Sequence, residues 1–547
     1  MKTRDYTDTK DHLLSGDDPI ARNMFLWFPP ILSVAIVLAA RYWAPLLGLL
    51  LLTVPPFLIA IFDLFQTKHT LRRLYPFTAR FRWFFEDLRP FLRSYIVEGD
   101  HEGMPFSRDQ RALVYARAKR QTDAQPFGTE LDVYGADFEW LSHSMSPEIH
   151  AVHDPRVMVG NAQCKRPYSA SCLNISAMSY GSLGAHAITA LNLGAKAGGF
   201  YHDTGEGGIS PYHRQGGDLV WELGTGYFGA RTPDGAFDPE RFRDKAQDDQ
   251  VKMVELKLSQ GAKPGKGGML PGAKVTKEIA DIRGVPEQQD VLSPAAHSAF
   301  TTPIGLLEFL AKMRDLSGGK PAGIKFCVGY PHELFALCKA MLETGIRPDF
   351  IVVDGGEGGT GAAPQEMSDR VGMPLREGLI MTRNALVGCG LKDDIRLVAS
   401  GKVHSAAGLA MNFAIGADWC NAARAFMFSL GCVQAQHCHT GKCPSAVATT
   451  SAARQRGLVI ADKAPRVANF HAKTVKSLRD IMVASGIREH TDFRPFHLRM
   501  RLNPSQMKSV DMIYEFLETG QLLAEPGATR YARHWQMAQA ESFRPVC

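Results

Sequence analysis

The sequence predicts an α/β protein built around a (β/α)8 barrel, the TIM-barrel fold, and three observations favour it. From about residue 156, short apolar runs typical of strands alternate with longer helical runs, as in parallel strands joined by crossover helices. The strand-like runs number eight. Glycines and charged residues follow several of these runs, which is the end of a barrel where active sites are assembled.

The elements of this barrel follow one another in a regular order. The expected strands are Leu173–Met178, Gly199–His202, Met253–Leu258, Asp290–Leu292, Gly323–Val328, Phe350–Val353, Arg396–Ala399 and Trp419–Ala422. Helices are expected at Ala185–Ala197, Pro303–Leu316, Glu333–Thr344, Arg376–Val387 and Ser405–Ile415. An open doubly wound sheet is the alternative, because the fourth strand, Asp290–Leu292, is weak.

The remaining segments lie on either side of the barrel. A helix that places Val475, Leu478, Ile481 and Met482 on one face is expected to end near Gly486 and to complete the outer layer. We therefore divide the chain into a tail (1–23), an apolar hairpin (24–65), a connector packed on the barrel (66–155), the barrel (156–486) with a cysteine loop at 431–444, and a C-terminal extension (487–547).

Two apolar runs near the N-terminus, Met24–Ala40 and Ala44–Phe62, are each close to the length that crosses a bilayer. Basic residues flank both outer ends, whereas the connector between the runs carries only Arg41. By the positive-inside rule, this predicts a transmembrane hairpin in the inner, cytoplasmic membrane with the barrel facing the cytoplasm. A cleaved signal peptide, a buried soluble hairpin and a re-entrant hairpin are the alternatives.

Composition narrows the class of protein. The 547 residues are 45% hydrophobic, which is ample for a large core. A net charge of +6 is small for this length, so nucleic acid is not an expected partner. Ten cysteines are too sparse for a disulfide scaffold and indicate a reducing compartment, where thiols serve metals or cores.

Three cysteines, Cys432, Cys438 and Cys443, occur within one short stretch that ends in Cys443-Pro444. Thiolates so closely spaced on a loop are typical of iron-sulfur ligands, and with no fourth cysteine nearby they predict a 3Fe-4S cluster. Two alternatives stay open. The interleaved His437 and His439 are compatible with a zinc site, and cysteines are often inert buried residues.

Two glycine loops follow consecutive strands, and both suit a phosphate group. Gly358-Gly359-Thr360-Gly361 offers backbone N–H groups that no side chain obstructs. Ser400-Gly401-Lys402 adds a hydroxyl and a positive charge in the region where barrels most often bind phosphate.

Several charged residues are candidates for chemistry. Lys325 lies inside an apolar strand, where its amine needs an acidic or polarisable partner unless it points outward. Glu206 sits between glycines at the expected barrel mouth, as an active-site acid or a solvated carboxylate. Lys263 and Lys266 lie in a glycine-punctuated loop able to bind a carboxylate.

These residues together make the chain resemble the synthase domain of glutamate synthase, an FMN-binding barrel whose neighbouring loop holds a 3Fe-4S cluster. The matching segments are Ile175–Ser182, Thr204–Gly208, Gln260–Gly265, Lys325, Gly358–Gly361 and Gly431–Pro444. They occur in the same order over about 300 residues, so the set is far more specific than any single motif.

The resemblance implies a role for each matching position. Met178, Ser179 and Lys325 would lie near the flavin ring, with Gly358, Gly359, Thr360, Gly401 and Lys402 near its phosphate. Lys263 and Arg283 would bind 2-oxoglutarate, with Glu206 and Gln260 close to the reacting carbon. In that family, ammonia and the keto acid form an imine, which reduced FMN converts to glutamate.

The chain also departs from the family pattern. The family's loop has Glu and Gln where this chain has Lys266 and Met269, so the keto acid is not fixed by the resemblance. The N-terminal glutaminase and its terminal cysteine are replaced here by Met1-Lys2 and the hairpin, so ammonia or an amine is the expected nitrogen source.

We therefore expect a membrane-anchored FMN and 3Fe-4S oxidoreductase that reduces the imine of 2-oxoglutarate or a related keto acid. Electrons would come from ferredoxin, a separate flavoprotein or quinone, and a homo-oligomer is compatible with the sequence. Two other functions remain open at this point. One is an amine or hydroxy-acid dehydrogenase that passes electrons to quinone, and the other is a non-catalytic electron-transfer subunit.

Overall fold

The computed structural model describes residues 19–546. Its contacts divide the chain after Gly103 into an N-terminal unit and a larger unit that runs from Met104 to the C-terminus. The expected 66–155 connector is thus split between the two units. Each unit is described separately below.

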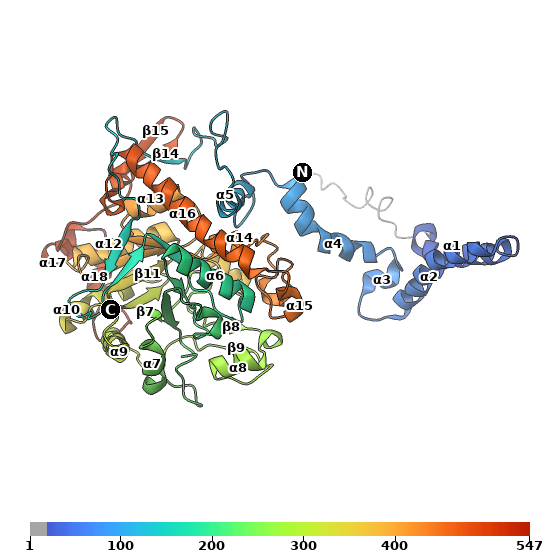
Figure 1. The fold of residues 1–547 in the computed structure, drawn as a ribbon, viewed down its shortest axis with the longest axis horizontal. Coiled ribbons are helices and arrows are strands. Elements are labelled where there is room, and N and C mark those ends of the chain that lie inside the picture. Colours follow the sequence, from blue (N-terminus) through green and yellow to red (C-terminus); the bar gives the residue numbers. More distant parts are fainter. Residues whose placement is uncertain (1–18, 547) are drawn as a thin grey trace, which may run out of the picture. The chain divides into compact units, whose positions relative to one another are not determined.

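The larger unit is a closed barrel of eight parallel strands with helices around it, as predicted (Figure 1). In chain order the barrel strands are β4 (Leu173–Ile175), β5 (His202–Asp203), β6 (Leu219–Leu223), β7 (Val251–Lys257), β10 (Ala322–Phe326), β11 (Phe350–Asp354), β12 (Arg396–Ser400) and β13 (Trp419–Ala422). β13 pairs with β4, with Asn421 opposite Asn174, and this pairing closes the ring. The closed barrel excludes the open doubly wound sheet.

One predicted barrel strand is wrong. Val291–Leu292 (β9) pairs antiparallel with β8 (Met269–Leu270) in a small ribbon outside the barrel. The strand that the sequence analysis missed is β6, Leu219–Leu223. Glu222 interrupts its apolar run, yet this carboxylate is fully buried because two lysines compensate it inside the barrel.

The ends of several helices in the outer layer are explained by the residues found there. Pro303 occupies the first turn of α9, and the Thr302 hydroxyl accepts a hydrogen bond from Gly305 N at 3.0 Å. Gly199 and Gly345 end two other helices in the left-handed conformation that glycine adopts without strain. The layer contains α6 (Ala185–Gly198), α7 (Pro239–Ala246), α9 (Pro303–Leu316), α10 (Pro331–Thr344), α12 (Leu375–Gly388), α13 (Ala406–Ala414) and α14 (Arg424–Ser429).

The barrel interior has its own apolar cluster, in which strand residues such as Val352 and Trp419 pack with Val157, Val159 and Ala170. The last three belong to the hairpin of β2 (Arg156–Val159) and β3 (Tyr168–Ser171). Strand residues in this cluster, such as Trp419, Phe350 and Val220, lie at or near the amino ends of their strands. The hairpin therefore closes the amino end of the barrel and leaves the carboxyl end for the site.

Elements before and after the barrel in sequence pack on its outside. The long helix α16 (Ile460–Ser485) ends at Gly486 and buries Val475, Leu478 and Met482, as predicted. It packs against α6, α13 and α5 (Arg108–Ala118). The other peripheral elements are β1 (Glu139–Leu141), α8 (Lys277–Arg283), α11 (Gln365–Arg370), α15 (Ala452–Gln455), β14 (Leu498–Asn503), β15 (Gln506–Ser509), α17 (Gln521–Ala524) and α18 (Ala532–Met537).

The N-terminal unit is helical and carries its apolar side chains on the outside. Its elements are α1 (Pro19–Ala39), the 3₁₀ helix Ala44–Leu49, α2 (Leu50–Phe65), α3 (Thr70–Leu74), α4 (Arg80–Leu92) and a π-helical turn at Arg93–Val97. Helices α1 and α2 lie side by side, and the Ser33 and Thr53 hydroxyls are 2.6 Å apart (Figure 1). Within the described residues, Ala44–Phe65 alone is long and apolar enough to cross a membrane, since Met24–Ala39 is shorter. The transmembrane hairpin therefore stays a prediction.

Candidate functional site

Two adjoining cavities at the carboxyl end of the barrel contain nearly every residue singled out from the sequence. The larger, about 330 Å³, is lined by Met178, Ser179, Glu206, Gln260, Lys263, Gly359, Thr360, Cys432, Cys438 and Cys443, among others. The smaller, about 50 Å³, is lined by Lys325, Gly358, Gly401 and Lys402 together with Gln260 and Gly359. Because Gln260, Gly359 and Arg424 line both cavities, the two form one continuous site.

A separate cavity of about 430 Å³ lies between the loop before α9 and the start of α10, and includes Phe300, Leu306 and Leu334 in its wall. It is the more voluminous of the two large cavities, but it is mostly apolar and contains none of the predicted site residues. We assign the functional site to the 330 Å³ cavity because the chemically reactive side chains converge there.

The smaller cavity has the character of an anion site. The half-buried Arg424 and Lys402 line it, and neither makes an ion pair with a carboxylate within the described residues. Burial lowers the pKa of Arg424 to about 10, and burial together with the charge of Arg424 lowers the pKa of Lys402. Asp354 also lines the cavity, but two cations that form no ion pair fit a bound phosphate group.

Gly359 contributes to this fit by its lack of a side chain. A Cβ at this position would lie 2.8 Å from Nε of Arg424. Any larger residue would therefore displace the guanidinium that lines the pocket. This constraint explains why the loop after β11 carries glycine next to Thr360.

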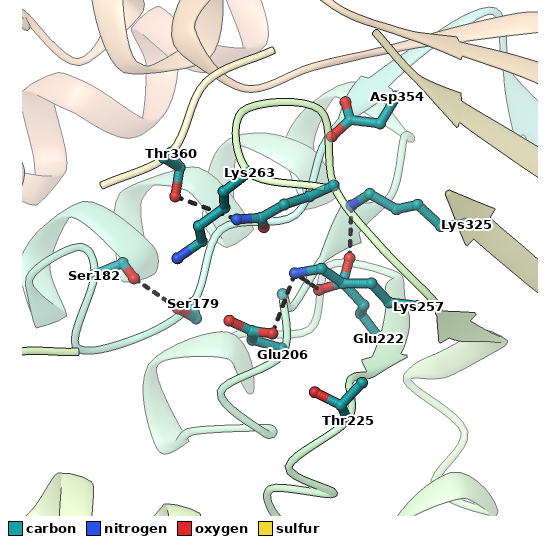
Figure 2. A network of polar contacts seen from close by, with 12 residues as sticks. Ser179, Ser182, Glu206, Glu222, Thr225, Lys257, Lys263, Lys325, Asp354 and Thr360 are labelled. Atoms are coloured by element: carbon teal, nitrogen blue, oxygen red, sulfur yellow. Dashed lines mark hydrogen bonds and ion pairs between the residues drawn. The ribbon is translucent and has the colours of Figure 1, made fainter. Parts of the chain in front are cut away.

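A chain of four alternating charges runs from the cavity into the barrel (Figure 2). Glu206 Oε2 accepts a hydrogen bond from Lys257 Nζ at 3.2 Å, and Lys257 Nζ lies 3.4 Å from Glu222 Oε1. Lys325 Nζ donates to Glu222 Oε2 at 2.6 Å. Lys325 thus points inward and has the acidic partner that its buried position requires. Its position among apolar neighbours is explained by this pairing.

The charges in this network determine which groups hold protons. Burial alone lowers the pKa of Lys325, but Glu222 and Glu255 outweigh it and hold that pKa well above its usual value. Burial raises the pKa of Glu222, but Lys257 and Lys325 overcome it and bring that pKa to about 2. Burial and the charge of Glu222 raise the pKa of Asp203 to about 7. The two lysines and Glu222 are therefore charged at neutral pH.

Glu206 faces the cavity opposite the loop that carries Lys263 (Figure 2). The loop passes close to this carboxylate at Gly268, where a Cβ would lie 1.8 Å from Oε1 of Glu206. Lys263 Nζ donates to Ala362 O at 3.0 Å, and burial lowers the pKa of Lys263 to about 8. Gln260 Nε2 donates to Thr360 Oγ1 at 3.4 Å. The cavity therefore brings an acid, an amine and an amide together.

Two neighbours of Lys263 in the sequence are placed differently. Met269 lines the 330 Å³ cavity, whereas the side chain of Lys266 is exposed. Arg283 is buried but does not line either cavity. Its guanidinium donates to Tyr180 O at 3.0 Å and lies against the Phe228 ring. Among the predicted site residues, Arg283 is the one that the structure places behind the cavity wall.

The cysteine loop forms the other side of the same cavity. Cys432, Cys438 and Cys443 all line it. Burial is the main cause that raises the pKa of Cys432, and the charges of Cys438 and Cys443 raise it further. The loop is held by Tyr115, whose hydroxyl donates to Cys432 O, and by Lys274, whose Nζ donates to Cys438 O at 3.3 Å.

The spacing of the three thiols bears on the choice of metal. A single tetrahedral zinc ion holds its sulfur ligands about 2.3 Å from the metal, hence within about 4 Å of one another. In the part of the chain that the structure describes, the one set of three potential ligands within 4.8 Å of one another is Asp203, Glu222 and Glu255. The three thiols do not form such a set, and Glu222 and Glu255 are already paired with lysines.

Sequence analysis missed Arg424, Lys257, Glu222 and Asp203. Arg424 follows β13 directly, so its position after the last barrel strand was a usable signal. The other three lie within strands β5, β6 and β7, where a charged residue breaks the apolar pattern by which strands are recognised. Their mutual pairing, which makes burial tolerable, is visible only in three dimensions.

The fold and the site define a (β/α)8-barrel protein with an anion pocket and a thiol-rich loop at its active end. A family model described as a conserved region in glutamate synthase matches residues 141–488. The glutamate synthase large subunit-like protein YerD of Bacillus subtilis is 37% identical over 501 residues, which cover 84% of this chain and 95% of YerD. The chain belongs to the glutamate synthase family and is an enzyme, a glutamate synthase-like oxidoreductase.

Two further comparisons show lower identity. An archaeal-type glutamate synthase [NADPH] of Thermotoga maritima is 32% identical over 314 residues, which cover 57% of this chain and 59% of that protein. The chain thus spans about three fifths of the length of this relative. Among solved structures, a flavocytochrome b2 mutant with pyruvate bound is similar at a TM-score of 0.41 and 12% identity, covering 76% of this chain and 91% of that one.

Proposed function

We propose that the protein is an FMN and 3Fe-4S oxidoreductase that reduces the imine of 2-oxoglutarate, or of a related keto acid, to an amino acid. One observation carries the proposal: an anion pocket, an acid-amine pair and three thiols line one continuous site. Ammonia or a simple amine would supply the nitrogen. Electrons would enter through the cluster from ferredoxin, a separate flavoprotein or quinone.

The residues of the site fit FMN. Its phosphate would be held by Gly358, Gly359, Thr360, Gly401, Lys402 and Arg424. Its ring would contact Met178, Ser179 and Lys325. When bound, FMN would supply the hydride that reduces the substrate carbon. The protein would contribute two cations for the phosphate and a charged lysine for the ring. The cation pair without a carboxylate partner supports this assignment most directly.

Substrate binding would depend on the loop from Gln260 to Met269. The Lys263 ammonium, which lines the 330 Å³ cavity, would bind the carboxylate of the keto acid. Glu206, which the Lys257 ammonium holds in place, would accept a proton from the incoming ammonium ion. Gln260 would orient the substrate from the side of Thr360. Arg283 would act indirectly, because it donates from behind the cavity wall to the Ser179 hydroxyl and to the Tyr180 carbonyl.

The thiol loop would hold the cluster. Three potential thiolate ligands line one wall of the cavity, which is the number that a 3Fe-4S cluster with three protein ligands would need. Ser445 Oγ lies 3.4 Å from Cys443 Sγ, and together with nearby backbone amides it outweighs the effect of burial and lowers the pKa of Cys443. A lowered pKa favours the thiolate form that an iron ligand requires.

Membrane anchoring through the N-terminal unit is part of the proposal. Leu51 and Phe65 of α2 are 78% and 79% exposed, and their neighbours Leu52, Leu58 and Phe62 are exposed as well. A helix whose apolar residues face outward all round is favoured in lipid rather than in water. We infer that the hairpin anchors the protein in the inner membrane, with the barrel on the cytoplasmic side.

Anaerobic stopped-flow spectroscopy of the purified holoenzyme tests this function. We expect chemically reduced enzyme to be reoxidised when 2-oxoglutarate and ammonia or methylamine are added together, and the oxidised flavin spectrum to shift on adding the keto acid alone. A dehydrogenase would give the opposite result. An amino or hydroxy acid would then bleach the flavin, and the reduced enzyme would not respond to keto acid plus amine. No response to any small acid would establish an electron-transfer subunit.

Replacing Met269 by Gln tests the substrate preference. A side-chain amide at this position in the cavity wall can hydrogen-bond a carboxylate, which a thioether cannot. One such bond contributes about 1 kcal/mol, so the KM for 2-oxoglutarate is expected to fall about fivefold. Met158→Gln, at an exposed strand position, is the control and leaves KM unchanged. An unchanged KM in Met269→Gln would show that this side chain does not contact the acid.

The pH dependence of kcat/KM tests the role of Lys263. Its pKa of about 8 means that the ammonium form, which attracts a carboxylate, is lost as the pH rises through that value. We expect kcat/KM for the keto acid to be level below pH 7 and to fall about tenfold per unit above pH 8. Lys263→Arg keeps the charge and should move the fall to higher pH, and Lys263→Met should lower kcat/KM throughout. An identical profile in all three proteins would exclude this role.

A further inference from the structure

Helix α4, which follows the apolar hairpin, is strongly amphipathic. At 100° per residue, its apolar side chains fall within an arc of about 120° on one face. This apolar face consists of Phe81, Phe84, Phe85, Leu88, Phe91 and Leu92. Phe84 and Phe85 are each 57% exposed, so a large part of the face is left uncovered by the described chain. The exposure continues into the next turn, where Ile96 is 75% exposed.

Basic side chains border this apolar face on both sides. By the same geometry Arg80 lies at one edge, and Arg82 and Arg89 lie at the other. Arg80 pairs with Asp63 and Arg82 pairs with Glu86, so Arg89 is the edge arginine most available to a phosphate group. Between residues 66 and 97 the chain has seven basic and two acidic side chains. Long arginine side chains at the edges of an apolar face can reach phosphate groups while the face itself enters an apolar phase.

Trp83 lies on the polar face of α4, on the side away from the apolar face. The Arg72 guanidinium lies 4.4 Å from the centre of its ring, and the guanidinium of its sequence neighbour Arg82 lies 5.7 Å from it. These cation–π contacts gather positive charge around the indole. The face of α4 that is opposite the apolar face is therefore polar and positively charged around Trp83.

The position of α4 is fixed relative to the end of α2. Asp63, fully buried near that end, accepts hydrogen bonds from Arg80 Nε and Nη2, both at 2.7 Å, and from Phe77 N at 3.1 Å. Helix α4 therefore begins where the long apolar helix stops. If α2 crosses a bilayer, its end and the start of α4 lie at the same depth, at the boundary with water.

We propose that α4 is an interfacial helix that lies on the surface of an anionic lipid bilayer, with its apolar face among the acyl chains and its arginines on lipid phosphates. This inference rests on the proposed membrane anchoring and adds a second, electrostatic contact to it. The surface is continuous with the hairpin and its charge is complementary to anionic headgroups. A second copy of the chain or another protein is the alternative occupant of the apolar face.

Depth-dependent quenching in vesicles tests this proposal. Full-length holoenzyme is reconstituted in phosphatidylglycerol vesicles with an environment-sensitive fluorescent amino acid encoded at Phe84, at Glu86 on the opposite face, or at Leu52 in α2. Lipids carrying a nitroxide on the acyl chain should quench the fluorophore at Phe84 several-fold more than the one at Glu86. In phosphatidylcholine, or at high salt, the quenching at Phe84 should decrease while that at Leu52 persists.

The three label positions separate the possible outcomes. Quenching at Leu52 with none at Phe84 would overturn the interfacial helix and leave the anchoring intact. Quenching at Phe84 with none at Leu52 would support the interfacial helix and overturn the transmembrane hairpin. No quenching at either position would overturn both. A fluorophore at Phe84 that is shielded from water to the same extent in detergent and in both lipids would indicate a protein partner. That result would overturn the proposal.

Discussion

Replacing Cys438 by Ser is expected to abolish the 3Fe-4S cluster while leaving the flavin in place. A three-iron cluster with three protein thiolates has no spare ligand, and a serine hydroxyl is a poor substitute for the thiolate. Cys438 lines the same cavity wall as Cys432 and Cys443, and the carbonyl of Cys438 accepts a hydrogen bond from Lys274. Loss of the thiol therefore removes one ligand without altering the phosphate pocket at Lys402.

Electron paramagnetic resonance and iron analysis measure this result. The wild-type protein should show the signal of an oxidised three-iron cluster, and Cys438→Ser should lose both the signal and most of the iron. Flavin absorbance, retained in the variant, reports that the fold is intact. Cys164→Ser provides the matched control, because Cys164 lies outside the cavity. Zinc without iron in the wild-type protein, or an unchanged signal in Cys438→Ser, would refute the cluster assignment.

Replacing Lys325 by Met is expected to destabilise the barrel by about 3–5 kcal/mol, the usual effect of removing one partner of a buried ion pair. Glu222 is completely buried and would keep only Lys257, 3.4 Å away, as a counter-charge. Its pKa, which the two lysines now bring to about 2 against the effect of burial, would rise. Asp203 and Glu255 would lose the same compensating charge.

Chemical denaturation monitored by fluorescence measures this loss of stability. The double variant Lys325→Met with Glu222→Gln should recover much of the loss, because both members of the pair are then neutral. Lys312→Met, on the outer layer beside Phe237, changes a lysine outside the barrel and should shift stability by less than about 0.5 kcal/mol. Equal stability of Lys325→Met and the wild-type protein would show that the ion pair is not needed in the barrel.

Much of the barrel was predictable because its strands are apolar on both faces. Phe350–Asp354 and Arg396–Ser400 are recognisable as buried strands, and α9 was predicted with its observed bounds, since Pro303 and Thr302 mark its start. Leu219–Leu223 was missed because Glu222 interrupts it, and Asp290–Leu292 was chosen in its place. Local patterns cannot show that a buried charge has a partner elsewhere in the chain.

The candidate site was predictable where the chemistry is carried by short motifs. The thiols of the cysteine loop and the glycines after β11 and β12 lie in the site as expected. Arg283 shows the limit of carrying over a position by resemblance, since it supports the wall from behind instead of facing the cavity. Arg424 shows the opposite case, a cation whose role as a lining residue appears only when the barrel closes.

The sequence by itself determined the barrel, the family and the residue types of the site, because periodicity and ordered motifs are local properties of the chain. Only the tertiary structure decided which charges meet. Glu206, Lys257, Glu222 and Lys325 come from four separate segments, and each charge is tolerable only because an opposite charge from another segment lies within 3.4 Å. Desolvation thus makes their pairing a property of the closed barrel, where distant strands become neighbours.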